Sequence, residues 1–180
     1  MADHMDDLEF AVEHDVPIPY IKRISTYYQT LGYGKPYRWA QYTDVPFTTL
    51  KKPLKDSRIS LITTAAPYQP DKGDQGPGAP YNSAAKFYRV YTDSIEGEPD
   101  TRISHIGIDR KHTTATDSNT WFPLKQLKRL AAEGRIGALA SEFIGAPTNR
   151  SQKVTIEQDA VEILATLRAQ GSDVAILAAN

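Results

Sequence analysis

The chain has 180 residues, of which 40% are hydrophobic and 24% charged, and its 21 basic and 22 acidic residues give a formal net charge of −1. This suits one globular domain with a sizeable core, and the balanced charge without a polybasic block argues against nucleic acid or a membrane surface as a partner. No apolar run reaches the roughly 18 residues of a membrane span, and the acidic N-terminus is unlike a signal peptide, so we expect a cytoplasmic protein.

The sequence contains no cysteine and only four histidines. Disulfides, thiolate zinc sites and a thiol nucleophile are therefore excluded within these 180 residues, and metal chemistry has few candidate ligands. The ten tyrosines and two tryptophans are interpreted mainly as packing residues, because aromatic side chains supply much of the area in cores and interfaces.

The N-terminal third begins with a weakly patterned acidic stretch, residues 1–15, which we expect to form a loose arm before an α/β domain over residues 16–180. The first predicted helix covers Pro17–Leu31, because prolines stand at its start and apolar residues recur at helical spacing. The first predicted strand is Arg58–Ala66, which is rich in β-branched residues.

The middle of the chain is less regular. Gln69–Pro80 is dense in Gly, Pro and Asp and is predicted to be a loop, with a surface insertion favoured over a lid. Phe87–Tyr91 and Thr101–Ile106 are predicted to be short strands.

Two helices and a strand are predicted in the C-terminal third. Pro123–Ala132 and Thr155–Ala169 have helical apolar spacing, and Thr155 with Gln158 matches a capping box at the start of the second helix. Ile136–Ile144 is predicted to be a connecting segment and Val174–Ala178 a strand. The order of strand, helix and strand predicts an α/β fold with a mainly parallel sheet flanked by helices, in three layers of the flavodoxin or Rossmann type.

The strand Val174–Ala178 is followed by only two further residues, ending at Asn180. In open α/β folds, ligands bind beyond the carboxyl ends of the strands. We therefore expect the fold to be incomplete without a C-terminal half or a partner chain that supplies part of the site. Asn180 either contacts a ligand or is a frayed end.

The first candidate site is Ser104-His105 with Asp109 and His112, which follows a predicted strand. Three readings stay open: a divalent metal site, proton transfer or substrate binding with Asp109 orienting His105, and a polar loop held by side-chain hydrogen bonds. The metal reading is the weakest, because the spacing matches no compact metal motif.

The second candidate is Thr63-Thr64 at the end of the first strand, where hydroxyl groups can hold a carboxylate or phosphate. An equally good alternative is that these hydroxyls cap the next turn. Gly171–Asp173 is interpreted as a turn that joins the last helix to the last strand.

Several segments together carry a family resemblance. They are Arg102–His105 with Asp109, Asn119–Leu124, Leu127, Leu130, Ala132–Gly137, Val45–Phe47 and the strand Arg58–Ala66. On these segments, roughly residues 16–180 resemble the selenoprotein B family of glycine, sarcosine, betaine and D-proline reductases.

The resemblance implies an enzyme that reductively cleaves a C–N or similar bond at the α-carbon of a small amino-acid-like substrate, with a thiol electron donor. In that family a cysteine or selenocysteine attacks the substrate, and it lies just after a strand like Val174–Ala178. The resemblance therefore implies that this group, or a pyruvoyl group, stands after Asn180 or on a companion chain, with no cofactor in this chain. It also implies a catalytic pair, His105 and Asp109, and substrate-binding positions at Thr63, Thr64 and Ser104.

Two other functions stay open at this point. One is a metal-dependent hydrolase or lyase that uses His105, Asp109 and His112. The other is a non-catalytic subunit that scaffolds a partner.

Overall fold

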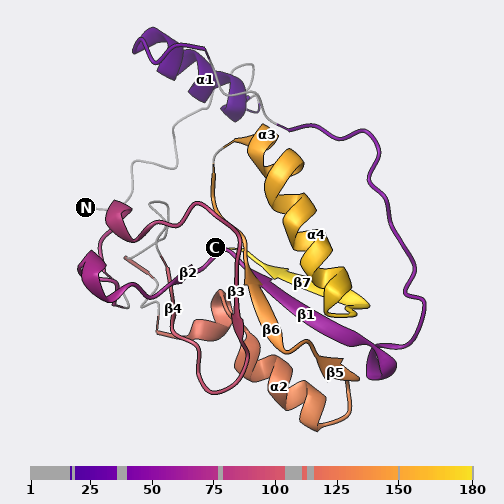
Figure 1. Cartoon of the computed structure of the whole chain (residues 1–180). Coiled ribbons are helices and arrows are strands. Elements are labelled where there is room, and N and C mark those ends of the chain that lie inside the picture. The colour runs from indigo at the N-terminus through magenta and orange to yellow at the C-terminus, as the bar shows by residue number, and fades with distance from the viewer. Residues whose placement is uncertain are drawn as a thin grey trace, which may run out of the picture. The chain divides into compact units, whose positions relative to one another are not determined.

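The computed structural model describes residues 17, 19–35, 40–76, 79–103, 111–112, 116–149 and 151–179 (Figure 1). The chain divides into two compact units, and the boundary between them in the sequence falls between Pro46 and Phe47. The first unit contains helix α1 (Tyr20–Thr30), which confirms the predicted first helix. It begins after Pro19, and Gly32 follows its end with a φ of 80°, a conformation that glycine adopts without strain.

The second unit is built on a five-stranded sheet. Its members are β1 (Arg58–Thr63), β3 (Tyr91–Ser94), β5 (Ala138–Leu139), β6 (Glu142–Gly145) and β7 (Val174–Ala178). β1 pairs in parallel with β5, β6 and β7, and β3 pairs antiparallel with β6. This confirms the predicted α/β class with a mainly parallel sheet.

β1 is the central strand of this sheet. Ile59 pairs with Leu139 of β5 and with Val174 of β7, and Ile62 pairs with both Ile144 and Leu177. Because a strand has only two edges, β5 and β6 share one edge of β1 and β7 occupies the other.

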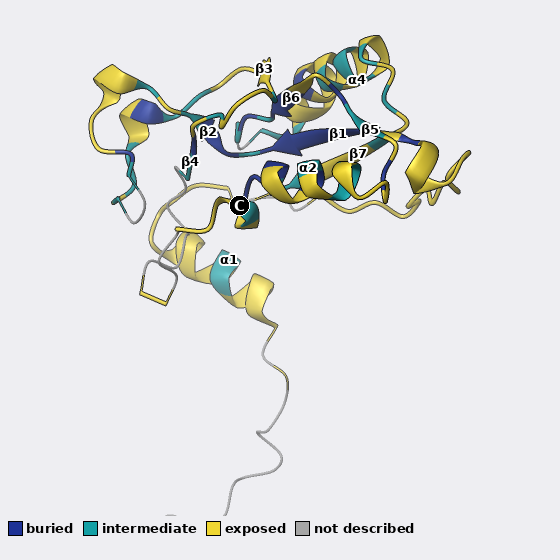
Figure 2. Ribbon diagram, turned by 90° about the horizontal axis from the view of Figure 1, so that it is seen from below, coloured by how far each residue is buried: buried dark blue, intermediate teal, exposed yellow. Residues whose placement is uncertain are grey.

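Two helices cover the opposite faces of this sheet. Ile59 and Leu61 pack in one core cluster with residues of α2 (Leu124–Ala132). Ser60 faces the other way, and its hydroxyl donates a hydrogen bond of 3.2 Å to Gln170 just past α4 (Ala160–Ala169). Since successive side chains of a strand point to opposite faces, the layers are helix, sheet and helix, and Figure 2 shows buried β1 between α4 and α2. The predicted three-layer arrangement is confirmed.

The predicted connecting segment Ile136–Ile144 is wrong, because it contains β5 and β6. Phe143 and Ile144 are 1% and 0% exposed, among the most buried side chains of the sheet. The two strands are only two and four residues long, and Ala140 and Ser141 between them have weak strand propensity. The apolar pattern of these two strands is too short and too interrupted to predict them without their pairing partner, β1.

The boundaries of two other predicted strands also differ in the structure. β3 begins only at Tyr91, the last residue of the predicted strand Phe87–Tyr91. Of the predicted strand Thr101–Ile106, the structure assigns β4 (Thr101–Arg102), which pairs antiparallel with β2 (Ala66–Pro67). Single 3₁₀ turns cover Leu54–Asp56, Pro70–Lys72, Ser83–Ala85 and Ser118–Thr120.

The last helical region begins earlier than predicted. α3 (Gln152–Val154) leads through a π-helical turn at Thr155–Asp159 into α4. The hydroxyl of Ser151 accepts a hydrogen bond of 3.3 Å from the Val154 amide and caps the helix. The predicted capping box at Thr155 is therefore wrong, because Thr155 lies inside the helix that Ser151 has already started. Across the described residues, no helix is long and apolar enough to cross a membrane.

Candidate functional site

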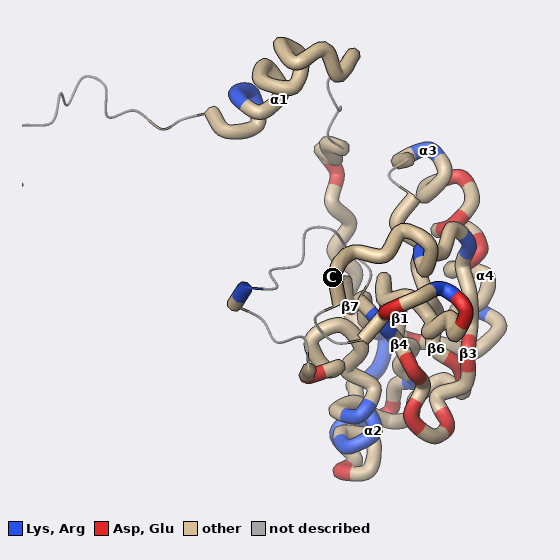
Figure 3. The backbone as a smooth tube through the Cα atoms, turned by 90° about the vertical axis from the view of Figure 1, so that its left-hand side faces the viewer, with Lys and Arg blue, Asp and Glu red and all other residues tan. Residues whose placement is uncertain are grey.

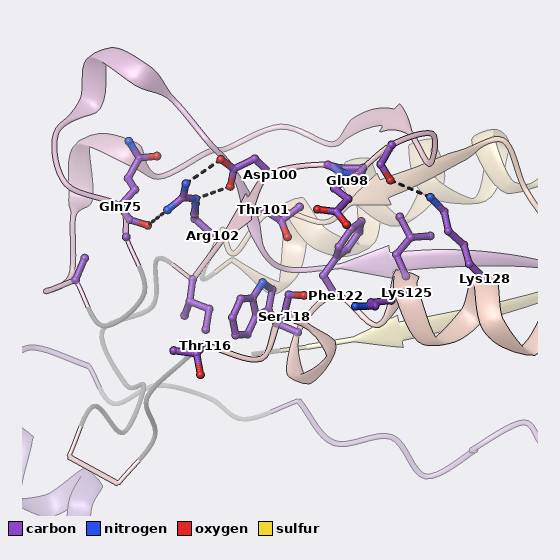
Figure 4. A pocket seen from close by; sticks show the side chains of 17 residues that line it. Gln75, Glu98, Asp100, Thr101, Arg102, Thr116, Ser118, Phe122, Lys125 and Lys128 are labelled. Carbon is purple, nitrogen blue, oxygen red and sulfur yellow. Dashed lines mark hydrogen bonds and ion pairs between the residues drawn. The ribbon is translucent and has the colours of Figure 1, made fainter.

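A cavity of about 710 Å³ opens in the second unit (Figure 4). Three segments line it: the loop around Gln75, the stretch Gly97–Ile103 that contains β4, and residues from Thr116 into the first turns of α2. Its volume lies within the range of roughly 300–1,000 Å³ that is common for small-molecule sites.

The cavity lies where the fold class predicts a ligand site. The hydroxyl of Thr63, the last residue of β1, donates a hydrogen bond of 2.6 Å to the carbonyl of Trp121, and Trp121 lines the cavity. The start of α2 is therefore held against the carboxyl end of β1. In α/β folds this edge of the sheet is the usual place for ligands.

Arg102 ties two walls of the cavity together. Its guanidinium donates to both carboxylate oxygens of Asp100, at 2.5 and 2.8 Å, and to the carbonyl of Gln75 at 3.1 Å (Figure 4). It also lies 4.7 Å from the ring centre of Tyr68. The hydrogen bonds to Asp100 hold the pKa of Arg102 above its usual value. Arg102 therefore serves to join β4 to the Gln75 loop, and its charge is already matched.

Basic residues gather on α2 (Figure 3), and the first turns of this helix line the cavity. Lys128 donates a hydrogen bond of 3.0 Å to the carbonyl of Gly97, which closes one rim. Lys125 and Glu98 also line the cavity, and neither has an ion-pair partner among the described residues. The cavity wall therefore carries two lysines and one glutamate without an ion-pair partner in the described part of the chain.

Trp121 has an unusual environment. Its side chain is 6% exposed, and its buried indole nitrogen has no acceptor within the described residues. A buried donor without a partner costs about 1–3 kcal/mol. The end of α2 that follows it has no side-chain cap, and its first turn has no acidic residue. The Leu124 amide at the start of α2 donates to the carbonyl of Phe122 at 2.8 Å, so the indole nitrogen is the unpaired donor of this segment among the described residues.

The two predicted threonines lie next to this cavity rather than in its wall. Thr63 is fully buried, and besides donating to Trp121 its hydroxyl accepts a hydrogen bond of 3.1 Å from the Ala65 amide. The bond with Ala65 is the local one that the turn-capping alternative expects, whereas the bond to Trp121 joins distant parts of the chain. The Thr64 amide donates to the carbonyl of Ala178 at 3.2 Å, so the end of β7 lies beside the end of β1. Substrate binding by Thr63 and Thr64 stays a prediction.

Ser104, His105, Asp109 and Asn180 lie outside the described residues. Ile103, the described residue that precedes the first three in the sequence, lines the cavity. Among the described residues, no group of three or more His, Asp or Glu side chains is placed to hold a metal ion. His105 and Asp109 are not among those residues, so the metal alternative is not tested.

The sequence did not single out Trp121, Glu98 or Lys125. Trp121 was interpreted as a packing residue, which accounts for its ring but not for its N–H group. A signal was present, because the stretch from Asn119 to Leu124 stands immediately before a helix N-terminus and belongs to the segments that carry the family resemblance.

Comparisons with known proteins place this fold in a family. Residues 27–180 match the glycine/sarcosine/betaine reductase selenoprotein B family. The D-proline reductase subunit gamma of Acetoanaerobium sticklandii is 33% identical over 139 residues, which are 74% of this chain and 53% of the relative. The chain therefore spans about half the length of this relative. No solved structure matches it. The chain belongs to the glycine/sarcosine/betaine reductase selenoprotein B family.

Proposed function

We propose that this chain forms the substrate-binding part of an enzyme that reductively cleaves a C–N or similar bond of a small amino-acid-like compound. The observation that carries the proposal is the family match over residues 27–180. The cavity at the carboxyl end of β1 supports it, since its volume of about 710 Å³ accommodates a small amino acid and its wall carries charges of both signs.

The reaction needs groups that this sequence lacks. Reductive cleavage of a C–N bond consumes two electrons and two protons, which two thiols supply on forming a disulfide. The chain has no cysteine. The thiol or selenol centre, or a pyruvoyl group, therefore belongs in this proposal to an adjoining segment or to a companion chain, and the electron donor is an external thiol.

The free edge of β7 supports a companion polypeptide. Among the described strands β7 pairs only with β1, and Ile176 and Leu177 are 36% and 61% exposed. On α4, Val161 and Leu164 are 60% and 46% exposed. An edge strand leaves backbone groups unpaired, and apolar residues grouped around it are typical of a contact surface. We assign this edge to a parallel strand from the polypeptide that corresponds to the other half of the relative's length.

His105 and Asp109 take the proton-transfer role in this proposal. His105 delivers a proton to the nitrogen that leaves, and Asp109 orients its ring. Ser104 binds the substrate alongside Thr63 and Thr64. The support for His105 and Ser104 is their place in the sequence directly after the cavity-lining residues Arg102 and Ile103.

The test combines the chain with the polypeptide that corresponds to the rest of the relative, and supplies a dithiol with D-proline, glycine, sarcosine or betaine. We expect one disulfide formed for each substrate molecule consumed. His105→Ala should lower turnover at least about tenfold, and His112→Ala should leave it unchanged. Complete assembly without dithiol oxidation on any of these substrates would contradict the proposal and favour a scaffolding subunit. Equal loss of activity in both variants would favour the metal-dependent alternative.

A further inference from the structure

We infer that a helix of the companion polypeptide packs beside α4, in the angle between α4 and the free edge of β7. The inference rests on the companion polypeptide of the proposed function. It goes beyond that function, because the free edge of β7 alone calls only for a strand. The helix covers one flank of α4 and the side chain of Leu177 on β7.

α4 is much less buried than α2. α2 buries Leu124 and Leu127 against the sheet, whereas no residue of α4 is buried. A helix in a layer of an α/β fold normally buries one apolar stripe. α4 therefore carries apolar surface that the described part of the chain leaves uncovered.

A row of exposed residues runs along one flank of this helical region. Ile156 in the π-helical turn is followed at intervals of four by Ala160 and Leu164 of α4, and all three are exposed. Ile156 and Leu164 are 53% and 46% exposed, which is unusual for large apolar side chains in a row. Rows at this spacing form the ridges through which helices pack against one another.

The handedness of the chain shows which way this flank faces. α4 carries the chain from β6 to β7, which lie at opposite edges of β1, and such crossovers are right-handed. The half-buried Ile163 marks the side of α4 that faces the sheet. Each residue of a right-handed helix turns it by about 100°, so the next residue, Leu164, faces the β7 side and the preceding residue, Glu162, faces the opposite flank.

Leu177 exposes the same face of the sheet. Ile59 and Leu61 of β1 point toward α2, so Ile62 and its partner Leu177 on β7 point to the side of α4. Leu177 is 61% exposed, whereas Ile176 on the other face of β7 is 36% exposed. The larger uncovered apolar surface of β7 thus lies next to the exposed row of α4.

The topology names the occupant of this angle. A parallel strand at the free edge of β7 is reached through a crossover, usually a helix, and the right-handed rule places that helix on the side of α4. The match covers 53% of the relative, so nearly half of the relative's length is left for such a strand and its helix. The exposed row and Leu177 lie on the side where this rule expects the helix.

The test uses single introduced thiols, because the chain has no cysteine of its own. Maleimide should label Ile156→Cys, Leu164→Cys and Glu162→Cys readily in the chain alone, since all three positions are exposed. In the assembly with the polypeptide that corresponds to the rest of the relative, labelling of Ile156→Cys and Leu164→Cys should slow at least about tenfold. Glu162→Cys is the matched control on the opposite flank of the same helix, and its labelling should not change.

The mass of this chain, measured after separation from the companion, gives the extent of labelling. Unchanged labelling of Leu164→Cys in an assembly that protects Leu177→Cys would show a strand without a helix and would overturn the inference. Equal protection of Glu162→Cys and Leu164→Cys, or failure to assemble, would also overturn it. Dithiol-dependent turnover with Leu164→Cys unprotected would leave the proposed function standing. Protection of Leu164→Cys without such turnover would do the reverse.

Discussion

The hydroxyl of Thr63 donates a 2.6 Å hydrogen bond to the carbonyl of Trp121, which lies 58 residues further along the chain. This bond joins the carboxyl end of the central strand to the segment that leads into α2. It also fixes the backbone of the one cavity-lining tryptophan. The fold and the candidate site therefore meet at these two residues, and most of the following predictions concern this edge of the sheet or the strand beside it.

Thr63→Val should destabilise the protein by about 1–3 kcal/mol, because it leaves the Trp121 carbonyl and the Ala65 amide without their partner in a buried place. Urea unfolding measures this free energy. Thr92→Val is the control, since Thr92 is exposed on β3 and should change stability by less than about 0.5 kcal/mol. Equal stability of the two variants would show that the buried hydroxyl contributes nothing.

Gly145→Ala should lower the free energy of unfolding by about 1–3 kcal/mol through overpacking. A Cβ atom at Gly145 would overlap the ring of Tyr91, and that ring is fixed because its hydroxyl donates to the carbonyl of Ala65 at 3.0 Å. Burial, with a contribution from Asp93, also raises the pKa of Tyr91. Gly76→Ala is the matched control, because its added Cβ would make only an ordinary contact. Thermal unfolding that ranks the two variants the other way would contradict this packing.

Asp173→Asn should destabilise the protein at neutral pH. The Asp173 carboxylate pairs with Lys52 at 2.6 Å and accepts a hydrogen bond of 2.8 Å from the Arg58 amide, and these contacts lower its pKa. A carboxyl group whose pKa is lower in the folded state stabilises the folded protein at pH values above its ordinary pKa of about 4. This stabilisation is lost as the pH falls through the pKa of the folded state.

The measurement for Asp173 is urea unfolding of both proteins between pH 7 and pH 2. The difference between wild type and Asp173→Asn should be constant above about pH 5 and should shrink below pH 4. Glu96→Gln removes an exposed carboxylate with no ion pair in the described residues, and it serves as the control. A stability difference between wild type and Asp173→Asn that grows toward low pH would contradict a lowered pKa of Asp173.

Backbone amides of β7 should exchange with solvent much faster than those of β1 in the chain alone, because one edge of β7 is unpaired. Adding the polypeptide that corresponds to the rest of the relative should slow exchange in β7. Leu177→Asp should weaken that association at least about tenfold, whereas Tyr88→Asp, which precedes the strand at the opposite edge, should not. Strong protection of β7 in the isolated chain would argue against a partner strand.

A mainly parallel sheet could be predicted from the sequence, because β1 is rich in β-branched residues and β7 is an apolar strand preceded by a helix. That β1 pairs directly with β7 is known only from the structure. β6 could not, since its four residues include Glu142 and Gly145, and the burial of Phe143 and Ile144 between them depends on β1 and β3 on either side. Short inner strands are specified by their neighbours more than by their own pattern.

The sequence predicts a site at the carboxyl end of β1, and the cavity lies beside that end but is lined by other residues. A threonine pair at a strand end suggests a ligand contact, whereas the structure pairs the hydroxyl of Thr63 with two backbone groups. For Trp121, in contrast, the sequence predicts only packing. Whether an indole N–H group finds an acceptor depends on how segments far apart in the chain meet, and no local pattern contains that information.

The most direct test of the account is a crystal structure of the protein with D-proline bound. We expect the ligand in the cavity beside α2, in contact with side chains that line it. A ligand bound elsewhere, with this cavity empty, would contradict it.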